Sequence, residues 1–362
     1  MKKVLIGLSG GVDSTAAAII LKKKGYEVIG ITLKLWSDAQ SPAAPGGRFT
    51  GCRDDSAVLA AQKACKKLGI KHYVIDAEKP FTKKVVDYFI KSYTSGKTPN
   101  PCAVCNEEIK FKLLLKMMKE RKFDFIATGH YAQAEKGKKG IFLKKGKDGN
   151  KTQEYFLSRL KKEELKRILF PLGKMTKDES RKIAAKYVKA GKKESREACF
   201  LREGESPYEF INRMRNAKRK MRNSGTKNKG FLYDGEGNKL KELDYDYFKY
   251  TVGQRKGLNY SAGKPVYVTK IDAKNRAVYI GEMNEVFSDY FRAEKLNMYE
   301  KTKKKFTAEV KIRYLHKQAK ADIIIKGDRA KVKFKKPQFA VTPGQLAVFY
   351  KKDKVVGSGF IM

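Results

Sequence analysis

The sequence predicts an α/β N-terminal domain built on a doubly wound parallel sheet, then a small central adaptor domain and a C-terminal antiparallel β-barrel. Three observations support this fold class. Strand-like and helix-like segments alternate through the first half, a glycine-rich loop joins the first strand to the first helix, and short alternating strands fill the end of the chain. We place the three domains at 1–205, 206–285 and 286–362.

The first half follows a β-α-β-α order. Short apolar runs predict strands, and apolar residues at helical spacing predict the helices between them. This order implies parallel strands with helices on both faces, and ligands of such sheets bind beyond the carboxyl ends of the strands. The predicted strands are Val4–Leu8, Glu27–Leu33, His72–Asp76 and Asp124–Thr128, and the predicted helices are Ser14–Lys23, Asp54–Leu68, Phe81–Tyr93, Glu107–Arg121 and a capped helix from Thr176 to Tyr187.

Two other segments have a distinctive composition. The segment 35–51 is rich in proline and glycine, which favours either a mobile loop that closes over substrate or an ordinary surface loop. The segment 212–229 carries many Lys and Arg with almost no acid, which favours contact with an RNA backbone over a merely solvated face. The strands predicted for the barrel are Phe306–Tyr314, Ala321–Lys326, Ala330–Phe334, Leu346–Tyr350 and Val355–Phe360.

The charge of the chain points to a polyanionic partner. The 362 residues include 81 Lys and Arg against 39 Asp and Glu, a net charge of +42. Neutralising phosphates releases condensed counterions, so this excess favours nucleic acid, although a proteome rich in lysine would produce the same composition. No apolar run approaches membrane-spanning length and no signal peptide precedes the first strand, so we expect no membrane partner and a cytoplasmic protein.

The loop Ser9-Gly10-Gly11-Val12-Asp13-Ser14 is the strongest single motif. Its glycines let backbone approach a phosphate, the helix that follows offers amide donors, and Ser9 and Ser14 add hydroxyl groups. Asp13 is a candidate ligand for Mg²⁺ on the phosphates. The loop lacks the Gly-Lys-Ser/Thr ending of a Walker motif. It resembles the phosphate loop of ATP pyrophosphatases, which split ATP between its α and β phosphates and adenylate a substrate.

Cysteines form a second group of candidates. Cys102 and Cys105 stand in a Cys-x-x-Cys just before a predicted helix, where the helix dipole lowers the pKa of a thiol. Cys199 lies far along the chain between charged and aromatic residues. An odd count of five cysteines in an intracellular context argues against a disulfide framework, and redox, metal-binding and plain buried roles all remain open.

An ordered series of motifs resembles the tRNA-specific 2-thiouridylases, which place sulfur on the wobble uridine of tRNA and have an adenine nucleotide α-hydrolase-like catalytic domain. The resemblance runs nearly end to end and therefore covers the whole chain. The matching segments are 9–14, 98–111, 127–132, 171–176, 199–200, 250–258 and 343–345.

This resemblance implies ATP-dependent 2-thiolation through an adenylated uridine. It implies that Cys199 carries a persulfide received from a sulfur-relay donor protein and that Cys105 is the partner thiol, with Asp13 as a further catalytic residue. Both thiols must reach one carbon, so we expect the segments near 102 and 199 to meet in space. The cofactors implied are ATP and Mg²⁺, and the substrate is a tRNA that contains the wobble uridine.

Further site residues are carried over from the same resemblance. The ATP site would comprise Gly7, Leu8, Ser9, Gly10, Gly11, Val12, Asp13, Ser14, Leu33 and Gly129. The tRNA contacts would comprise Asn100, Pro101, Cys102, His130, Lys151, Thr152, Gln153, Arg313, Tyr314 and Gln345.

The chain departs from the family at Cys102, where many relatives have aspartate. The extra thiol leaves open a [4Fe–4S] cluster on Cys102, Cys105 and Cys199 in place of the persulfide route, and no metal ligand is certain. Thr152 replaces an aspartate, and a Gly-x-His-x-Gly expected before residue 250 is missing. Two rivals also remain: an adenylating enzyme that forms amides with incidental cysteines, and an inactive tRNA-binding module.

Overall fold

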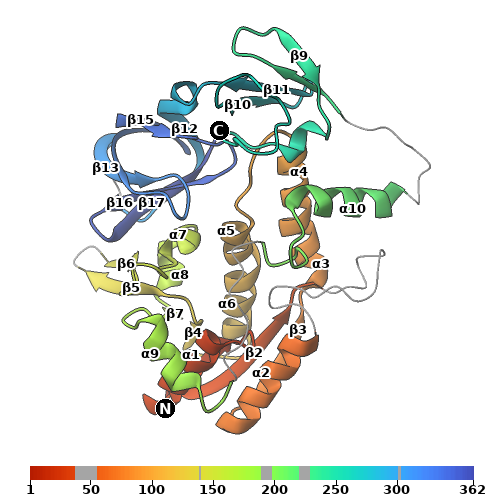
Figure 1. The fold of residues 1–362 in the computed structure, drawn as a ribbon. Helices are drawn as coiled ribbons and strands as arrows, with labels where there is room; N and C mark the ends of the chain where they lie inside the picture. The colour runs from red at the N-terminus through yellow and green to blue at the C-terminus, as the bar shows by residue number, and fades with distance from the viewer. Residues whose placement is uncertain (37–54, 138–139, 189–197, 220–228, 301–302) are drawn as a thin grey trace. The chain divides into compact units, whose positions relative to one another are not determined.

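The computed structural model describes residues 1–36, 55–137, 140–188, 198–219, 229–300 and 303–362. Most of the proline- and glycine-rich segment 35–51, and residues 220–228 of the basic segment 212–229, lie outside the described residues. The chain forms two compact units (Figure 1). The first comprises residues 1–86, 101–206 and 353–356, and the second comprises 87–100, 207–352 and 357–362.

A five-stranded parallel sheet organises the first unit, with strand order β3-β2-β1-β4-β7. All four strand pairs are parallel, as the sequence predicts. Strand β7 is not predicted from the sequence, because a strand of two residues carries no periodic signal. The strands are β1 Lys3–Gly7, β2 Glu27–Lys34, β3 His72–Asp76, β4 Phe125–Ala127 and β7 Ile168–Leu169.

Helices cover both faces of this sheet, because successive side chains of a strand point to opposite faces. Val4, Ile6 and Leu8 join a core with the alanines of α1 (Val12–Lys23) and with α2 (Asp55–Leu68). Gly7 faces Leu114 of α6. The doubly wound architecture is therefore confirmed. The remaining helices of the unit are α3 Glu78–Phe81, α5 Pro101–Cys105, α6 Phe111–Glu120, α7 Glu154–Leu157, α8 Lys162–Leu165 and α9 Lys177–Ala184.

Two helical boundaries differ from the sequence expectation. The helix expected from Glu107 begins at Pro101, because proline is well tolerated in a first turn that needs no amide donor, and it continues through a π-helical turn, Asn106–Lys110, into α6. The helix expected from Phe81 begins three residues earlier, at Glu78, as α3, which another π-helical turn, Thr82–Val86, follows. The sequence analysis also misses the hairpin of β5 (Ala132–Gly137) and β6 (Gly140–Lys145), whose alternation is weak.

The second unit contains a closed antiparallel barrel, because β12 pairs with both β15 and β17. Its inward side chains, such as Val310, Ile323 and Val332, are buried, whereas their neighbours along each strand are exposed or half-buried. The expected barrel is confirmed, and β12 is an additional strand. The barrel strands are β12 Phe287–Met298, β13 Lys305–Lys311, β14 Ala319–Lys326, β15 Arg329–Phe339, β16 Leu346–Lys351 and β17 Lys354–Ile361.

A small sheet of order β10-β11-β8-β9 forms the rest of the second unit, together with two helices. The strands are β8 Phe231–Tyr233, β9 Lys239–Glu242, β10 Tyr267–Asp272 and β11 Ala277–Gly281, and the helices are α4 Asp87–Thr94 and α10 Pro207–Arg219. Across the described residues, no helix combines the length and apolar character needed to span a bilayer.

Candidate active site

The phosphate loop lies at the carboxyl end of β1, which is the central strand of the sheet. Gly11 caps α1 in an extended conformation, and the hydroxyl groups of Ser14 and Thr15 donate to the Gly11 carbonyl at 3.1 and 3.0 Å. The Ser9 amide donates to Ser14 Oγ at 3.2 Å. The loop is therefore held in one shape by its own polar groups, and the first amides of α1 remain available to an anion. Gly7 ends β1, Leu8 is buried beyond it, and Val12 begins α1.

Two glycines fix how closely the loop can be packed. Gly10 has φ +72°, and a β-carbon there would lie 2.6 Å from the Ala57 carbonyl oxygen of α2. A β-carbon on Gly129 would lie 2.7 Å from the Asp13 carbonyl carbon and 2.7 Å from the Ser14 amide nitrogen. Gly129 therefore brings the chain after β4 directly against the first turn of α1. Leu33, the other residue expected beside adenosine, is only 9% exposed within β2.

Asp13 is held by two side chains of the same unit. The ammonium nitrogen of Lys177 lies 2.8 and 2.7 Å from the two carboxylate oxygens of Asp13. The Tyr131 hydroxyl donates to Asp13 Oδ1 at 2.7 Å. Lys177 opens α9, where Thr176 accepts from the Glu179 amide in the capping box that the sequence predicts. Sequence reasoning missed Lys177 and Tyr131 as site residues, since nothing in their local pattern marks a partner so distant along the chain.

The cysteine segments approach one another through a shared neighbour. Cys105 is buried at the end of α5, and α5 packs against the π-helical turn Thr82–Val86. Phe200, which follows Cys199, packs its ring 5.9 Å from the ring of Phe81, which directly precedes that turn. The structure therefore brings the two segments to the same region of the first unit.

Exposure distinguishes the cysteines of this unit. Cys102 is exposed, Cys199 is half-buried, and Cys65 on α2 is deeply buried, which raises the pKa of its thiol to about 11. An ion pair secures the helix that carries Cys102 and Cys105, because Arg159 donates two bonds of 3.1 Å to Glu107. The raised pKa of Cys65 leaves almost no thiolate at physiological pH, so this thiol is a poor nucleophile, whereas the half-buried Cys199 is accessible to a reactant.

His130 is half-buried and packs its ring against Phe111. Its Nδ1 lies 2.9 Å from Thr128 Oγ1, and its ring centroid lies 5.8 Å from that of Phe111. Burial, followed by the positive charge of Lys110, lowers the pKa of His130 to about 3, so the imidazole is neutral at physiological pH.

The depressed pKa of His130 predicts acid lability. An unfolded chain binds a proton at its ordinary pKa near 6.5, whereas the folded chain resists it, so the stabilisation is complete above that value and is lost as pH falls toward 3. We expect the free energy of unfolding of the wild type to drop by up to about 1.4 kcal/mol more per pH unit below about pH 6 than that of His130→Gln. Urea denaturation at several pH values measures this, and parallel curves for the two proteins would contradict it.

The residues expected to contact tRNA at 151–153 make internal bonds. Thr152 is buried, accepts from the Gly146 amide at 2.7 Å and donates to the Glu154 carboxylate. The side-chain oxygen Oε1 of Gln153 accepts from the Tyr131 backbone amide at 3.0 Å, and the backbone amide of Gln153 donates to the Tyr131 carbonyl. Gln153 thus braces the tyrosine that reaches Asp13, and Lys151 is half-buried beside them.

The expected contacts in the second unit are likewise engaged. The guanidinium of Arg313 donates to the carbonyls of Val252 and Ala340 at 3.3 and 3.2 Å and to the Thr342 hydroxyl. Gln345 Nε2 donates to the carbonyls of Thr98 and Pro99 at 3.1 and 3.2 Å, so the barrel holds the stretch that leads to buried Asn100. Tyr314 is half-buried, and the Lys311 ammonium lies 5.4 Å from the centroid of its ring. Pro101 belongs to the first unit and is also half-buried.

The donor groups of the phosphate loop fit a nucleotide. The loop offers backbone amides and hydroxyl groups to phosphates, as described. Among the described residues, no three His, Cys, Asp or Glu side chains are grouped as metal ligands, so Cys102, Cys105 and Cys199 are not gathered for an iron–sulfur cluster in this structure.

Comparison with known proteins gives a match for each part of the chain. The tRNA methyl transferase HUP domain matches residues 2–203, the tRNA methyl transferase PRC-barrel domain matches 223–282, and the aminomethyltransferase β-barrel domain matches 288–361. Among solved structures, the predicted subunit of a tRNA methyltransferase from Methanocaldococcus jannaschii is 18% identical with a TM-score of 0.34, covering 61% of this chain and 88% of that one, a similarity too low to inform on function.

Full-length relatives are similar over the whole chain. The tRNA-specific 2-thiouridylase MnmA of Caldicellulosiruptor saccharolyticus is 41% identical over 367 residues, covering 99% of this chain and 98% of that protein. The enzyme of the same name from Carboxydothermus hydrogenoformans is 40% identical over 369 residues, covering 99% and 97%.

A parallel sheet with a phosphate loop at its first helix, joined to a PRC-barrel and a β-barrel, defines an enzyme of the ATP-using phosphate-loop class within the HUP domains. Within that class, the chain belongs to the tRNA-specific 2-thiouridylase family.

Proposed function

We propose that this protein is a tRNA-uridine 2-sulfurtransferase that uses ATP to replace the C2 oxygen of the wobble uridine with sulfur. The observation that carries the proposal is the similarity to 2-thiouridylases over 99% of the chain, together with a formed phosphate loop and two cysteine segments in one region. The same unit thus offers a place for the nucleotide and thiols for the transfer.

Adenylation is the first step that we propose. Uracil C2 is a poor electrophile, because its oxygen is a poor leaving group. Attack of that oxygen on the α-phosphorus of ATP displaces pyrophosphate and forms an adenylated uridine, in which AMP becomes a good leaving group. Helix α1 directs its first amides at the phosphates, and the Ser9 and Ser14 hydroxyl groups add donors.

Sulfur transfer is the second step. A persulfide on Cys199, supplied by a sulfur-relay donor protein, attacks C2 through its terminal sulfur and expels AMP. The Cys105 thiolate then attacks Cys199 Sγ. This attack breaks the bond between Sγ and the former terminal sulfur of the persulfide, which stays on C2. The products are 2-thiouridine and a Cys105–Cys199 disulfide, and a thiol reductant returns the two electrons that restore both cysteines.

The two rival functions predict different outcomes. An amide-forming enzyme would keep turning over without Cys105 and Cys199, and an inactive tRNA-binding module would release no pyrophosphate. The test of the proposed function is nucleoside mass spectrometry of tRNA from cells that lack the gene. We expect 2-thiouridine to fall and to return with a plasmid copy, whereas unchanged 2-thiouridine would exclude the proposal.

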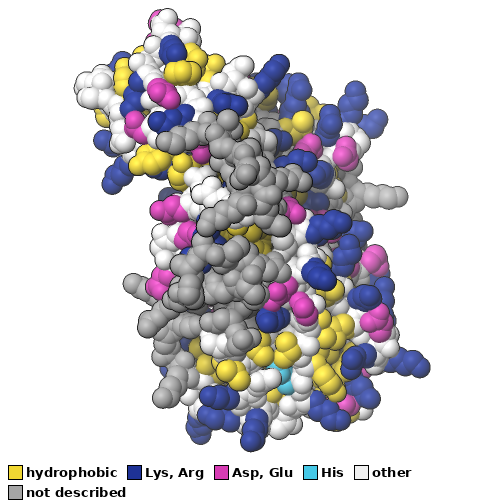
Figure 2. Space-filling model, turned by 90° about the vertical axis from the view of Figure 1, so that its right-hand side faces the viewer, with side chains coloured by type: hydrophobic (Ala, Val, Ile, Leu, Met, Phe, Trp, Pro, Cys, Tyr) yellow, Lys and Arg dark blue, Asp and Glu magenta, His cyan; other side chains and the backbone are white. Residues whose placement is uncertain are grey.

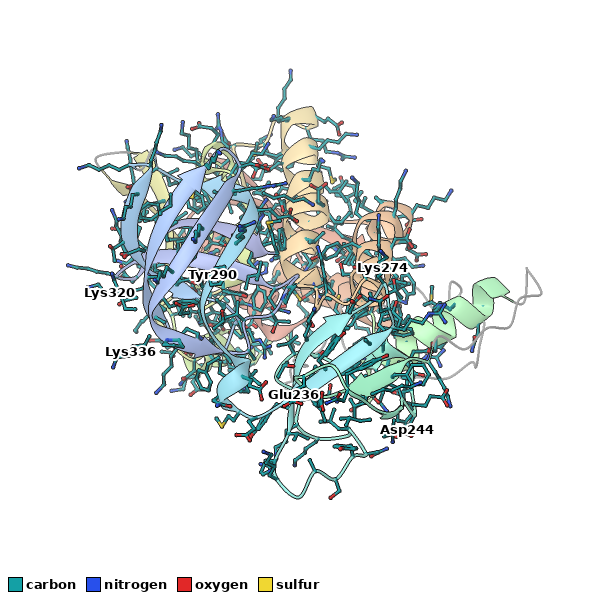
Figure 3. The ribbon with its side chains drawn as sticks, turned by 90° about the horizontal axis from the view of Figure 1, so that it is seen from above. Glu236, Asp244, Lys274, Tyr290, Lys320 and Lys336 are labelled. Atoms are coloured by element: carbon teal, nitrogen blue, oxygen red, sulfur yellow. The ribbon has the colours of Figure 1, made fainter. Side chains whose placement is uncertain are left out.

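Binding of tRNA needs a basic surface, and Lys and Arg side chains are spread over the face seen in Figure 2 rather than gathered in one block. On the barrel, strands β12 and β15 combine charge with an aromatic ring. Tyr290 is 52% exposed, lies opposite exposed Lys333 in the strand register, and has Lys331 5.8 Å from its ring centroid. Figure 3 shows Tyr290 on the broad face of these strands. A ring among cations suits base stacking beside phosphates.

We therefore expect this barrel face to contribute to the salt dependence of tRNA binding. Lys331→Gln with Lys333→Gln should reduce the slope of log affinity against log salt by about 1.4 to 1.8, because each of the two phosphate contacts contributes about 0.7 to 0.9. Titrations from about 50 to 200 mM salt measure the slope. The matched control is Lys66→Gln with Lys67→Gln on the exposed side of α2, and an equal loss in both pairs would exclude a specific role for the barrel face.

A further inference from the structure

Asp13 is the acidic side chain of the phosphate loop, and the sequence therefore makes it a candidate ligand for Mg²⁺. The structure gives its carboxylate other partners. Both oxygens lie within 2.8 Å of the Lys177 ammonium, and Oδ1 also accepts from the Tyr131 hydroxyl. Three bonds from two side chains therefore satisfy the group that a metal would need.

A magnesium ion does not fit this donor set. Mg²⁺ requires near-octahedral oxygen ligands at about 2.0 to 2.1 Å. To bind Asp13 it would displace an ammonium that already contacts both oxygens, and it would stand beside that positive charge. The Lys177 side chain is only 9% exposed, so its charge would lose its carboxylate partner without gaining full solvation.

The position of Lys177 is unusual for a lysine with only a structural role. It is the first residue of α9, and Asp13 is the second residue of α1, so the first turns of two helices meet at this pair. The N-terminus of a helix carries partial positive charge and disfavours a lysine. Asp13 offsets this cost, and the result is a cation held at the mouth of an anion-binding loop.

We propose that Asp13 anchors Lys177, and that Lys177, rather than a metal on Asp13, is the cation that this protein places beside the phosphate loop. The ligand that it serves is a nucleoside triphosphate. Magnesium then enters bound to the phosphates themselves, with no carboxylate ligand from the loop. Asp13 and Lys177 are positioning and binding residues of one unit, and neither acts fully without the other.

The experiment measures ATP binding by calorimetry, without tRNA or a sulfur source, at several magnesium concentrations. The proteins are the wild type, Asp13→Asn, Lys177→Met, the double variant and Lys177→Arg. We expect each of the first two single changes to weaken ATP binding by about tenfold or more, because a charge-assisted contact is lost. The double variant should be no weaker than either, and Lys177→Arg should recover part of the affinity.

The magnesium dependence separates the two roles of Asp13. If Lys177 is the cation, the magnesium concentration that gives half-maximal ATP affinity stays the same in all variants. If Asp13 is instead a metal ligand, Asp13→Asn raises the half-maximal magnesium concentration, whereas Lys177→Met lowers it or leaves it unchanged. A higher half-maximal magnesium concentration in Asp13→Asn would therefore overturn the proposal. ATP affinity unchanged in Lys177→Met would also overturn it.

Folding is controlled with thermal melts and a matched lysine. Lys147 pairs with Glu179 of α9 at 3.4 Å but is exposed, so Lys147→Met removes a lysine beside the same helix without touching Asp13. It should bind ATP as the wild type does, and a loss equal to that of Lys177→Met would assign the effect to α9 as a whole. Because no tRNA is present, failure of this proposal is distinguishable from failure of sulfur transfer.

Discussion

Cys199→Ser should lower the rate of 2-thiouridine formation by at least about 10³-fold while leaving pyrophosphate release in a single burst. The reason is chemical, because adenylation needs the phosphate loop and the base, whereas sulfur transfer needs a persulfide that serine cannot carry. Cys105→Ser should stop the reaction at a later step. AMP is released, but the transferred sulfur stays bonded to both Cys199 and C2 of the uridine. Rapid-quench assays that separate pyrophosphate, AMP and thiolated nucleoside measure the two blocks.

Cys102→Ser separates the persulfide route from an iron–sulfur cluster, since Cys102 stands on the same helix three residues from Cys105 but is exposed. The persulfide route does not use this thiol, so at saturating tRNA, where a weakened tRNA contact is compensated, we expect a thiolation rate within about threefold of the wild type. An iron–sulfur cluster would need all three thiolates, so loss of activity in Cys102→Ser equal to that in Cys199→Ser, together with iron in anaerobically purified protein, would contradict the persulfide route.

Gly129→Ala should abolish ATP-dependent pyrophosphate release. A β-carbon at this position would lie 2.7 Å from backbone atoms of both Asp13 and Ser14, and backbone cannot yield as a flexible side chain does. Relief of that overlap would move the first turn of α1 and, with it, the phosphate loop. We expect a loss of about 10²-fold or more in kcat/KM for ATP, since small misplacement of a binding group is costly.

Gly149→Ala provides the control for this prediction. Gly149 lies in the same unit, and apart from its two chain neighbours no described residue has an atom within 4 Å of the β-carbon that alanine would add. Its kinetics should match those of the wild type. Equal activity of Gly129→Ala and Gly149→Ala would show that the close approach of the chain to α1 is not required.

The sequence predicts the core of the fold well, because the central strands and the barrel carry periodic signals. Strand β3 agrees residue for residue with the prediction, and the capping box at Thr176 is present. Short or weakly alternating elements such as β7 and the β5–β6 hairpin escape prediction, since they carry little local signal.

The candidate site is only partly predictable for the same reason. The loop 9–14 carries its own local signature, as glycine and hydroxyl side chains are needed at fixed spacing. Lys177 lies 164 residues from Asp13, and only the fold brings them together. Arg313 and Gln345 illustrate the opposite case, in which the sequence selects a residue but not its contacts. The resemblance predicts both as tRNA contacts, whereas the structure shows that they donate hydrogen bonds to backbone carbonyls and so brace the second unit.

The most direct measurement of the central claim is an assay in vitro with transcribed tRNA, ATP, magnesium, a donor protein charged with persulfide and a thiol reductant, read by nucleoside mass spectrometry. Two transcripts that differ only at the wobble position, uridine or cytidine, are compared. The account predicts 2-thiouridine only in the uridine transcript and only with ATP, with one AMP formed for each sulfur inserted. Formation of AMP without 2-thiouridine, or sulfur in the cytidine transcript, would contradict it.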